Sequence, residues 1–303
     1  MKELQLKETP SLTFNNLLVH TKGNLLCYIS NGSIVTRSLS EFFAGKGEET
    51  IIPNISDYEV KHLAICLNGK CLAASCDIGV LFYDISSFSL LYFYKIEGNV
   101  TFSFGPIASD DDRVYVGDSS GNITSFVLQS MDDIKFESSA NISTVAISAL
   151  QVFSGSKLCA GLANGDIAFI HNLNTIIKLH KNKVEALEYP CTGIQIVKDV
   201  AVTAFGSGHV RLYSLKNGFN KMAEIAAHSK GVSALHACED KGSIVFATAS
   251  EDCSVFIWKY DIEFSAIKGE RIKDCLLTGV QFVDNNRVLV SSFEKKSCYL
   301  LEC

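Results

Sequence analysis

Several patterns that define common function classes are absent from the sequence. Its 303 residues include 4 Pro and 1 Trp, and its 11 Cys form no C-x-x-C pair. Without such a pair, neither a zinc site of the usual spacing nor a dithiol redox motif is expected. No stretch approaches the roughly 18 consecutive apolar residues of a membrane-spanning helix. A G-x-x-x-x-G-K-[ST] phosphate-binding loop is also missing. We therefore expect no metal site, no bound cofactor and no membrane span.

The charge balance argues against nucleic acid and membranes as partners. The chain has 27 Lys and Arg against 33 Asp and Glu, which gives a net charge of −6. Such a chain has no overall attraction for polyanions. Its first residues lack the apolar segment of a secretory signal. Most cysteines lie in apolar runs, as Cys27 and Cys159 do. We interpret them as reduced core thiols and expect a cytoplasmic location, with the nucleus as the alternative.

What the sequence does contain is an internal repeat. Seven segments share an apolar run, a small or polar turn, and a second, alternating apolar run. The equivalent turn residues are Asn31, Asp77, Ser120, Asn164, Ser207, Asp252 and Lys295, separated by 46, 43, 44, 43, 45 and 43 positions. A four-stranded propeller blade has a period of about this length. Side chains alternate after each turn, as in residues 208–213, which indicates strands rather than helices.

We therefore predict one all-β domain over residues 1–303, a seven-bladed β-propeller of four-stranded antiparallel blades. The predicted blades are residues 13–45, 57–95, 97–130, 142–176, 181–220, 229–262 and 275–303. The last of these ranges has no segment for an outer strand. Residues 3–9 alternate around Leu4 and Leu6, and we predict that they supply this strand and close the ring.

The sixth repeat, residues 227–259, resembles a WD40 repeat, and the resemblance is clearest over residues 195–260. In that family a His, a Ser or Thr, an Asp and a Trp form a buried hydrogen-bond chain within a blade. The matching residues here are His228, Thr248, Asp252 and Trp258. Lys259 stands where the family has a terminal Asp. The other repeats keep little beyond the apolar pattern, and Phe or Tyr takes the Trp position in several of them.

The resemblance implies a non-catalytic scaffold or adaptor that binds partner proteins or peptides at the top face of the ring, near its central channel. That face carries the turns between second and third strands and the loops that lead into each blade. Loops commonly carry recognition in rigid folds. The residues that we select as candidate contacts follow a loop histidine or precede a turn aspartate: Lys181, Lys183, Lys230, Glu251 and Cys76.

A hydrolase with a site in the central channel is the alternative from another function class. Residues 117–121, GDSSG, match G-x-S-x-G, but a nucleophile elbow needs a helix after the turn. An alternating segment follows here, so we interpret this motif as a hairpin turn. The acidic run at 109–113, SDDDR, lacks the spacing of an EF-hand loop. We expect a loop between the first two strands of the third blade, with an acidic contact patch as the alternative.

Overall fold

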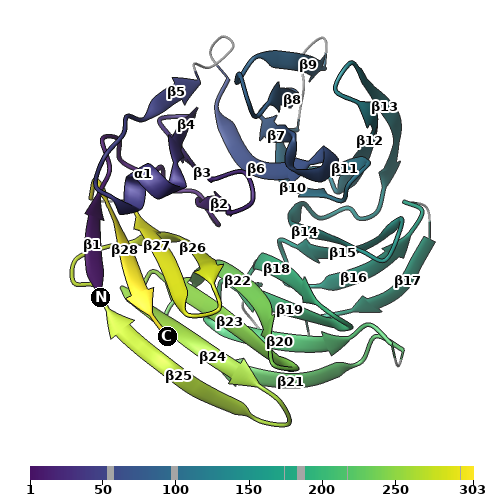
Figure 1. The fold of residues 1–303 in the computed structure, drawn as a ribbon. Helices are drawn as coiled ribbons and strands as arrows, with labels where there is room; N and C mark the ends of the chain where they lie inside the picture. The colour runs from purple at the N-terminus through teal and green to yellow at the C-terminus, as the bar shows by residue number, and fades with distance from the viewer. Residues whose placement is uncertain (53–57, 97–101, 174, 183–187, 217, 294) are drawn as a thin grey trace. The chain divides into compact units, whose positions relative to one another are not determined.

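The computed structural model describes the chain except for residues 53–57, 97–101, 174, 183–187, 217 and 294. Its strands form seven four-stranded antiparallel sheets, so the prediction of an all-β protein with seven blades is confirmed (Figure 1). The chain divides into two compact units. Unit 1 comprises residues 1–51 and 192–303, and unit 2 comprises residues 52–191.

Unit 1 contains four of the blades. The first blade has strands β2 (Leu18–His20), β3 (Leu25–Ser30), β4 (Ser33–Ser38) and β5 (Thr50–Ile52). The fifth has β18 (Cys191–Val197), β19 (Val200–Phe205), β20 (His209–Ser214) and β21 (Lys221–Ala226). The sixth has β22 (Val232–Asp240), β23 (Ser243–Ser250), β24 (Ser254–Tyr260) and β25 (Phe264–Arg271). The seventh has β26 (Leu277–Asp284), β27 (Arg287–Ser292), β28 (Ser297–Glu302) and β1 (Lys2–Gln5).

Unit 2 contains the other three blades. The second blade has β6 (Val60–Cys66), β7 (Cys71–Cys76), β8 (Gly79–Asp84) and β9 (Leu90–Lys95), with the 3-10 turn η1 (Leu67–Gly69) after β6. The third has β10 (Phe104–Ser109), β11 (Arg113–Asp118), β12 (Asn122–Ser130) and β13 (Asp133–Asn141). The fourth has β14 (Ile147–Phe153), β15 (Lys157–Leu162), β16 (Ile167–His171) and β17 (Thr175–His180).

The seventh blade is built from both ends of the chain, as the sequence predicted. Strand β1 pairs antiparallel with β28, so that Leu4 lies opposite Cys298 (Figure 1). Beyond the strand, the Leu6 N–H donates to the carbonyl of Lys296. Leu4 and Leu6 are each 6% exposed and pack in one apolar cluster with Leu289. The N-terminal strand therefore completes this sheet and contributes to its core.

A buried carboxylate holds the residues that follow β1. The Glu49 side chain is 1% exposed and lies 3.7 Å from the Arg37 guanidinium, which is itself buried. It accepts hydrogen bonds from the backbone N–H groups of Lys7 (2.9 Å) and Glu8 (3.2 Å) and from the Tyr28 hydroxyl (2.9 Å). A buried charge is tolerated only with such partners. The first blade thus fixes the path of the chain as it leaves the seventh.

Neighbouring inner strands are joined by side-chain hydrogen bonds at the spacing of the repeat. In unit 1 the Ser233 hydroxyl on β22 donates to the carbonyl of Leu277 on β26. In unit 2 the Ser109 hydroxyl on β10 donates to the carbonyl of Ile65 on β6 (2.6 Å). Each pair is 44 residues apart. The period therefore brings equivalent positions of consecutive blades together.

Two details differ from the sequence-based expectations. The outer strands β5, β13, β21 and β25 lie beyond the predicted blade ends at residues 45, 130, 220 and 262, and β17 extends beyond the predicted end at residue 176. These strands are largely exposed, with polar residues such as Lys221 and Glu224, so their apolar alternation is weak. A five-residue helix, α1 (Leu39–Phe43), also follows β4, and the Ser38 hydroxyl accepts a hydrogen bond from the Glu41 N–H at its start. One turn and a half is too short to show a helical period.

We predict that deleting residues 1–10 lowers the free energy of unfolding by about 3 kcal/mol or more. The deletion removes two buried leucines, each contributing about 1.5–3 kcal/mol, and leaves Glu49 without its two backbone donors. Urea unfolding followed by circular dichroism measures the change. An unchanged unfolding midpoint for the truncated chain contradicts the prediction that the N-terminal strand stabilises the seventh blade.

Candidate protein-interaction site

The antiparallel order of each blade places two kinds of connection at the same end of the sheet. These are the turn between the second and third strands and the segment that leads into the inner strand of the next blade. We call this end of the blades of unit 1 the top face of unit 1, and the opposite end its bottom face. The candidate site is built from residues of this top face.

In the sixth blade, hydrogen bonds connect the four residues expected from the WD40 resemblance. His228 Nδ1 lies 3.2 Å from both carboxylate oxygens of Asp252, and His228 Nε2 lies 2.8 Å from the Thr248 hydroxyl. The Trp258 indole N–H donates to the same hydroxyl at 3.0 Å. Thr248 is fully buried, and His228 and Trp258 are 9% and 8% exposed. The chain of bonds runs from the top-face turn into the middle of the blade.

The protonation state that fits these contacts is a neutral imidazole. The Thr248 hydroxyl oxygen accepts a hydrogen bond from the Trp258 indole, so the hydroxyl proton can be donated to His228 Nε2. The imidazole proton then lies on His228 Nδ1, which donates a hydrogen bond to Asp252. Burial lowers the pKa of His228 and outweighs the opposite effect of Asp252. Burial opposes ionisation of Asp252 as well, but His228 and the N–H groups of Ser229 and Ser254 lower its pKa overall. The aspartate is therefore ionised and caps its own turn.

The buried tetrad supports two exposed charged residues. Lys230 follows His228 on the loop that leads into β22, and Glu251 precedes Asp252 in the turn between β23 and β24. The Asp252 carboxylate accepts the Ser229 N–H at 3.0 Å, which ties this loop to this turn. Lys230 and Glu251 are thus displayed on a rigid support at the top face of unit 1.

The other selected residues are placed differently. Lys181 is exposed and directly follows β17 in unit 2, whereas Lys183 lies outside the described residues. Cys76 is the last residue of β7 and is 1% exposed, which corrects the expectation that it contacts a partner. All six residues of β7 are buried, because a second strand has neighbours on both sides and on both faces of its sheet.

The segment before β2 crosses the top ends of the inner strands of unit 1. The Asn15 amide donates to the carbonyl of Thr192 (2.8 Å) and its oxygen accepts the Leu235 N–H (3.0 Å). The neighbouring Asn16 N–H donates to the carbonyl of Thr278, and the Ser291 hydroxyl donates to the Asn16 carbonyl. Two adjacent asparagines therefore fasten this segment to the fifth, sixth and seventh blades.

Three large apolar side chains are exposed on this fastened surface. Leu12 and Phe14 belong to the segment itself and are 59% and 40% exposed. Phe293, 37% exposed, lies in the turn between β27 and β28, and its N–H donates to the carbonyl of Leu276. We name Leu12, Phe14 and Phe293 the top patch. The contact residues predicted from the sequence do not include it, although the apolar residues of 11-SLTFNN-16 are a signal.

The remaining motifs adopt ordinary structures. GDSSG forms the hairpin turn between β11 and β12, where the Asp118 carboxylate accepts the N–H groups of Ser120 (2.8 Å) and Asn122 (2.9 Å). The acidic run lies between β10 and β11, as predicted. Among the described residues, no group of three or more His, Cys, Asp or Glu is arranged to hold a metal ion. In the same part of the chain, no helix has the length and apolarity to cross a membrane.

Comparison with known proteins identifies a family and a similar fold. The model of the family described as WDR54 matches residues 71–297, which is 227 of the 303 residues. Among solved structures, a chain of "Crystal Structure of Mitotic Checkpoint Complex" is similar with a TM-score of 0.83 and 12% identity, covering 100% of this chain and 91% of that one. At this identity the likeness concerns the fold alone. No match was found among curated proteins.

We predict that the tetrad stabilises the sixth blade. Asp252→Ala should lower the free energy of unfolding by about 1–3 kcal/mol, because buried donors lose their acceptor. Trp258→Ala should lower it by about 3–5 kcal/mol through cavity formation. Lys259→Ala, which removes a partly exposed side chain and its surface ion pair with Asp261 (3.3 Å), is the control and should change it by less than about 1 kcal/mol. Urea titration measures all three, and wild-type stability of the first two variants contradicts the assignment.

We also predict that stability falls on acidification below about pH 6.5. Burial lowers the pKa of His228, and it lowers those of His62 and His236 to about 4. Each imidazole stays neutral in the folded chain over a range in which the unfolded chain binds a proton, so stability decreases as pH falls through that range. Melting temperatures between pH 7.5 and 4.5 test this. His228→Gln should show a shallower decrease, and an equal slope excludes a contribution from His228.

Proposed function

Because the chain belongs to the WDR54 family, we propose that it is a non-catalytic WD40-type scaffold that binds partner proteins or peptides through the top face of unit 1. The observation that carries this proposal is the top patch on its hydrogen-bonded support. Aromatic side chains on a pre-ordered surface are the usual energetic centres of protein interfaces. Ordering such a surface in advance also reduces the entropy that binding must overcome.

Charged residues are exposed on the same face as the top patch. Lys230 and Lys295 are exposed basic residues of this face, and Glu251 is an exposed acid. Rim charges orient partners and set association rates more than they determine affinity. We therefore assign Leu12, Phe14 and Phe293 the larger energetic role and the charges a role in selecting the partner. In this proposal the lysines selected from the sequence contribute less to affinity than the top patch does.

The shifted groups of the tetrad and the buried thiols have structural explanations, and no observation favours a hydrolase. His228 and Asp252 belong to the tetrad, and burial raises the pKa values of the buried thiols, such as Cys27 and Cys298. A perturbed pKa marks a functional site only when a fold-stabilising role does not account for it. The proposal is therefore limited to binding.

We further propose that the protein works in a reducing compartment, and specifically in the cytoplasm. The eleven cysteines, all among the described residues, form no disulfide, and eight of them are buried, where they pack as small apolar residues. Fractionation of cells that express a tagged chain tests the location. Recovery of the chain in a membrane or secreted fraction contradicts it.

The proposed binding face predicts which variants lose partners. Phe14→Asp with Phe293→Asp should reduce recovery of specific partners by about tenfold or more, since each removes a hot-spot type of contact. Ile262→Asp is the matched control, because Ile262 is 89% exposed in the bottom-face turn after β24. Affinity purification with quantitative mass spectrometry compares the variants at equal melting temperature. The proposal is wrong if the variant with Phe14→Asp and Phe293→Asp retains the partners of the wild type.

A further inference from the structure

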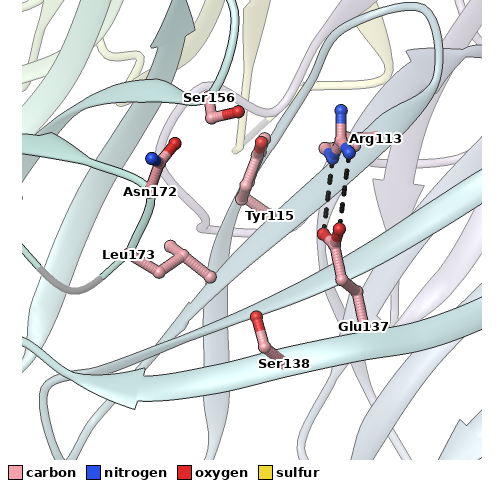
Figure 2. Close-up of a pocket in the computed structure, with 7 residues that line it drawn as sticks. All are labelled: Arg113, Tyr115, Glu137, Ser138, Ser156, Asn172 and Leu173. Carbon is pink, nitrogen blue, oxygen red and sulfur yellow. Dashed lines mark hydrogen bonds and ion pairs between the residues drawn. The ribbon is translucent and has the colours of Figure 1, made fainter.

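Unit 2 contains a polar pocket between the third and fourth blades. It lies at the end of these blades opposite the turns between their second and third strands. Its volume is about 280 Å³. Strands β11 and β13 form one wall, and the turns after β14 and β16 form the other. Figure 2 shows its lining residues, which are Arg113, Tyr115, Glu137, Ser138, Ser156, Asn172 and Leu173. This site is independent of the top patch, which belongs to unit 1.

A buried hydroxyl points into this pocket without a hydrogen bond. Tyr115 is 2% exposed, and its hydroxyl has no hydrogen-bond partner among the described residues. Burial raises the pKa of Tyr115 to about 12, so the group is neutral, while the nearby Ser156 hydroxyl acts to lower that pKa. In Figure 2 the hydroxyl lies between the Arg113–Glu137 pair and the side chains of Ser156 and Asn172. An unpaired buried hydroxyl is unfavourable, and a polar group of a ligand in the pocket would give it a partner.

The one basic group in the pocket is neutralised by neighbouring acids. The Arg113 guanidinium donates from Nε and Nη2 to the two Glu137 oxygens, each at 3.4 Å. Its Nη1 lies 3.6 Å from Asp112. A carboxylate has about four acceptor positions, and Arg113 uses two of those on Glu137. The Glu137 side chain is 37% exposed, so the remaining acceptor positions are accessible to a ligand.

The third-blade side of the pocket is acidic. Among residues 109–138, the acids at this end of the third blade outnumber the bases six to two. The acids are Asp110, Asp111, Asp112, Asp132, Asp133 and Glu137, and the bases are Arg113 and Lys135. Such a surface attracts cations and repels anions. A carboxylate ligand for Arg113 is therefore disfavoured, even though the guanidinium alone would suit one.

We propose that this pocket binds the guanidinium of an arginine side chain from a basic partner peptide. Glu137 is the charged acceptor, bridging Arg113 and the incoming arginine. The Tyr115 hydroxyl accepts a hydrogen bond from the guanidinium, and the Asn172 amide oxygen supplies a further acceptor. The planar guanidinium, with five N–H donors, fits several acceptors spread around it better than an ammonium does. Leu173, buried at 6% exposure, packs against the arginine methylene groups.

The test uses fluorescent peptides of alternating glycine and arginine, with citrulline, lysine and glutamate versions. Citrulline keeps the shape of arginine without its charge. Fluorescence anisotropy with the full chain should show binding of the arginine peptide and none of the citrulline or glutamate peptides. Glu137→Gln should weaken binding about tenfold or more, as expected for loss of a charged hydrogen-bond acceptor. Tyr115→Phe should weaken it about threefold to tenfold, as expected for a neutral one.

The controls separate the pocket from its acidic surroundings. Glu263→Gln makes the same charge change at an exposed site of unit 1 and should leave binding unchanged. Asp111→Asn changes the acidic loop without touching the pocket and should weaken binding less than Tyr115→Phe does. If Asp111→Asn abolishes binding and Tyr115→Phe does not, the peptide binds the loop and the proposal is wrong. Tighter binding of the glutamate peptide, or no binding of any peptide, overturns it as well.

Discussion

The pairing of the two chain ends in one sheet is the constraint on which unit 1 depends. Strands β26, β27 and β28 leave an outer edge that β1 fills, and Leu4 from one end packs with Leu289 from the other. A strand edge and an apolar face left open are both unfavourable. Glu49 then fixes the backbone that leaves β1, and Asn15 and Asn16 fasten the next segment to the fifth, sixth and seventh blades. The segment that carries Leu12 and Phe14 of the top patch is held in place by these successive attachments.

The blades reach stability by different means although they share one strand order. The sixth blade uses a buried hydrogen-bond chain that ends on the indole of Trp258. In unit 2 the second and third blades use aromatic packing instead: Phe82 and Tyr94 contact Phe126 edge to face, with ring centroids 5.4 and 5.1 Å apart. Edge-to-face pairs add to the energy of burial. Aromatic contacts thus join two blades that lack the full set of WD40 residues.

The two proposed binding regions differ in chemistry. The top patch in unit 1 is apolar, with lysines among its neighbours, and it suits a partner with apolar contacts. The pocket in unit 2 is polar, with an acidic rim, and it suits a cationic side chain. Each site is rigid because its residues lie on strands or on turns that side-chain hydrogen bonds fix.

The sequence by itself determined the repeat, the number of blades, the role of the N-terminal strand and the residues of the tetrad. These follow from local periodicity and from residue types at fixed spacing, which neighbours along the chain already encode. It did not determine which side chains are exposed, so Cys76 was selected and Phe14 was not. Only the tertiary structure decided that Tyr115 faces Ser156 and Asn172, and that Asn15 reaches Thr192, 177 residues away. Such contacts depend on how separate blades pack, and no local pattern in the chain specifies that.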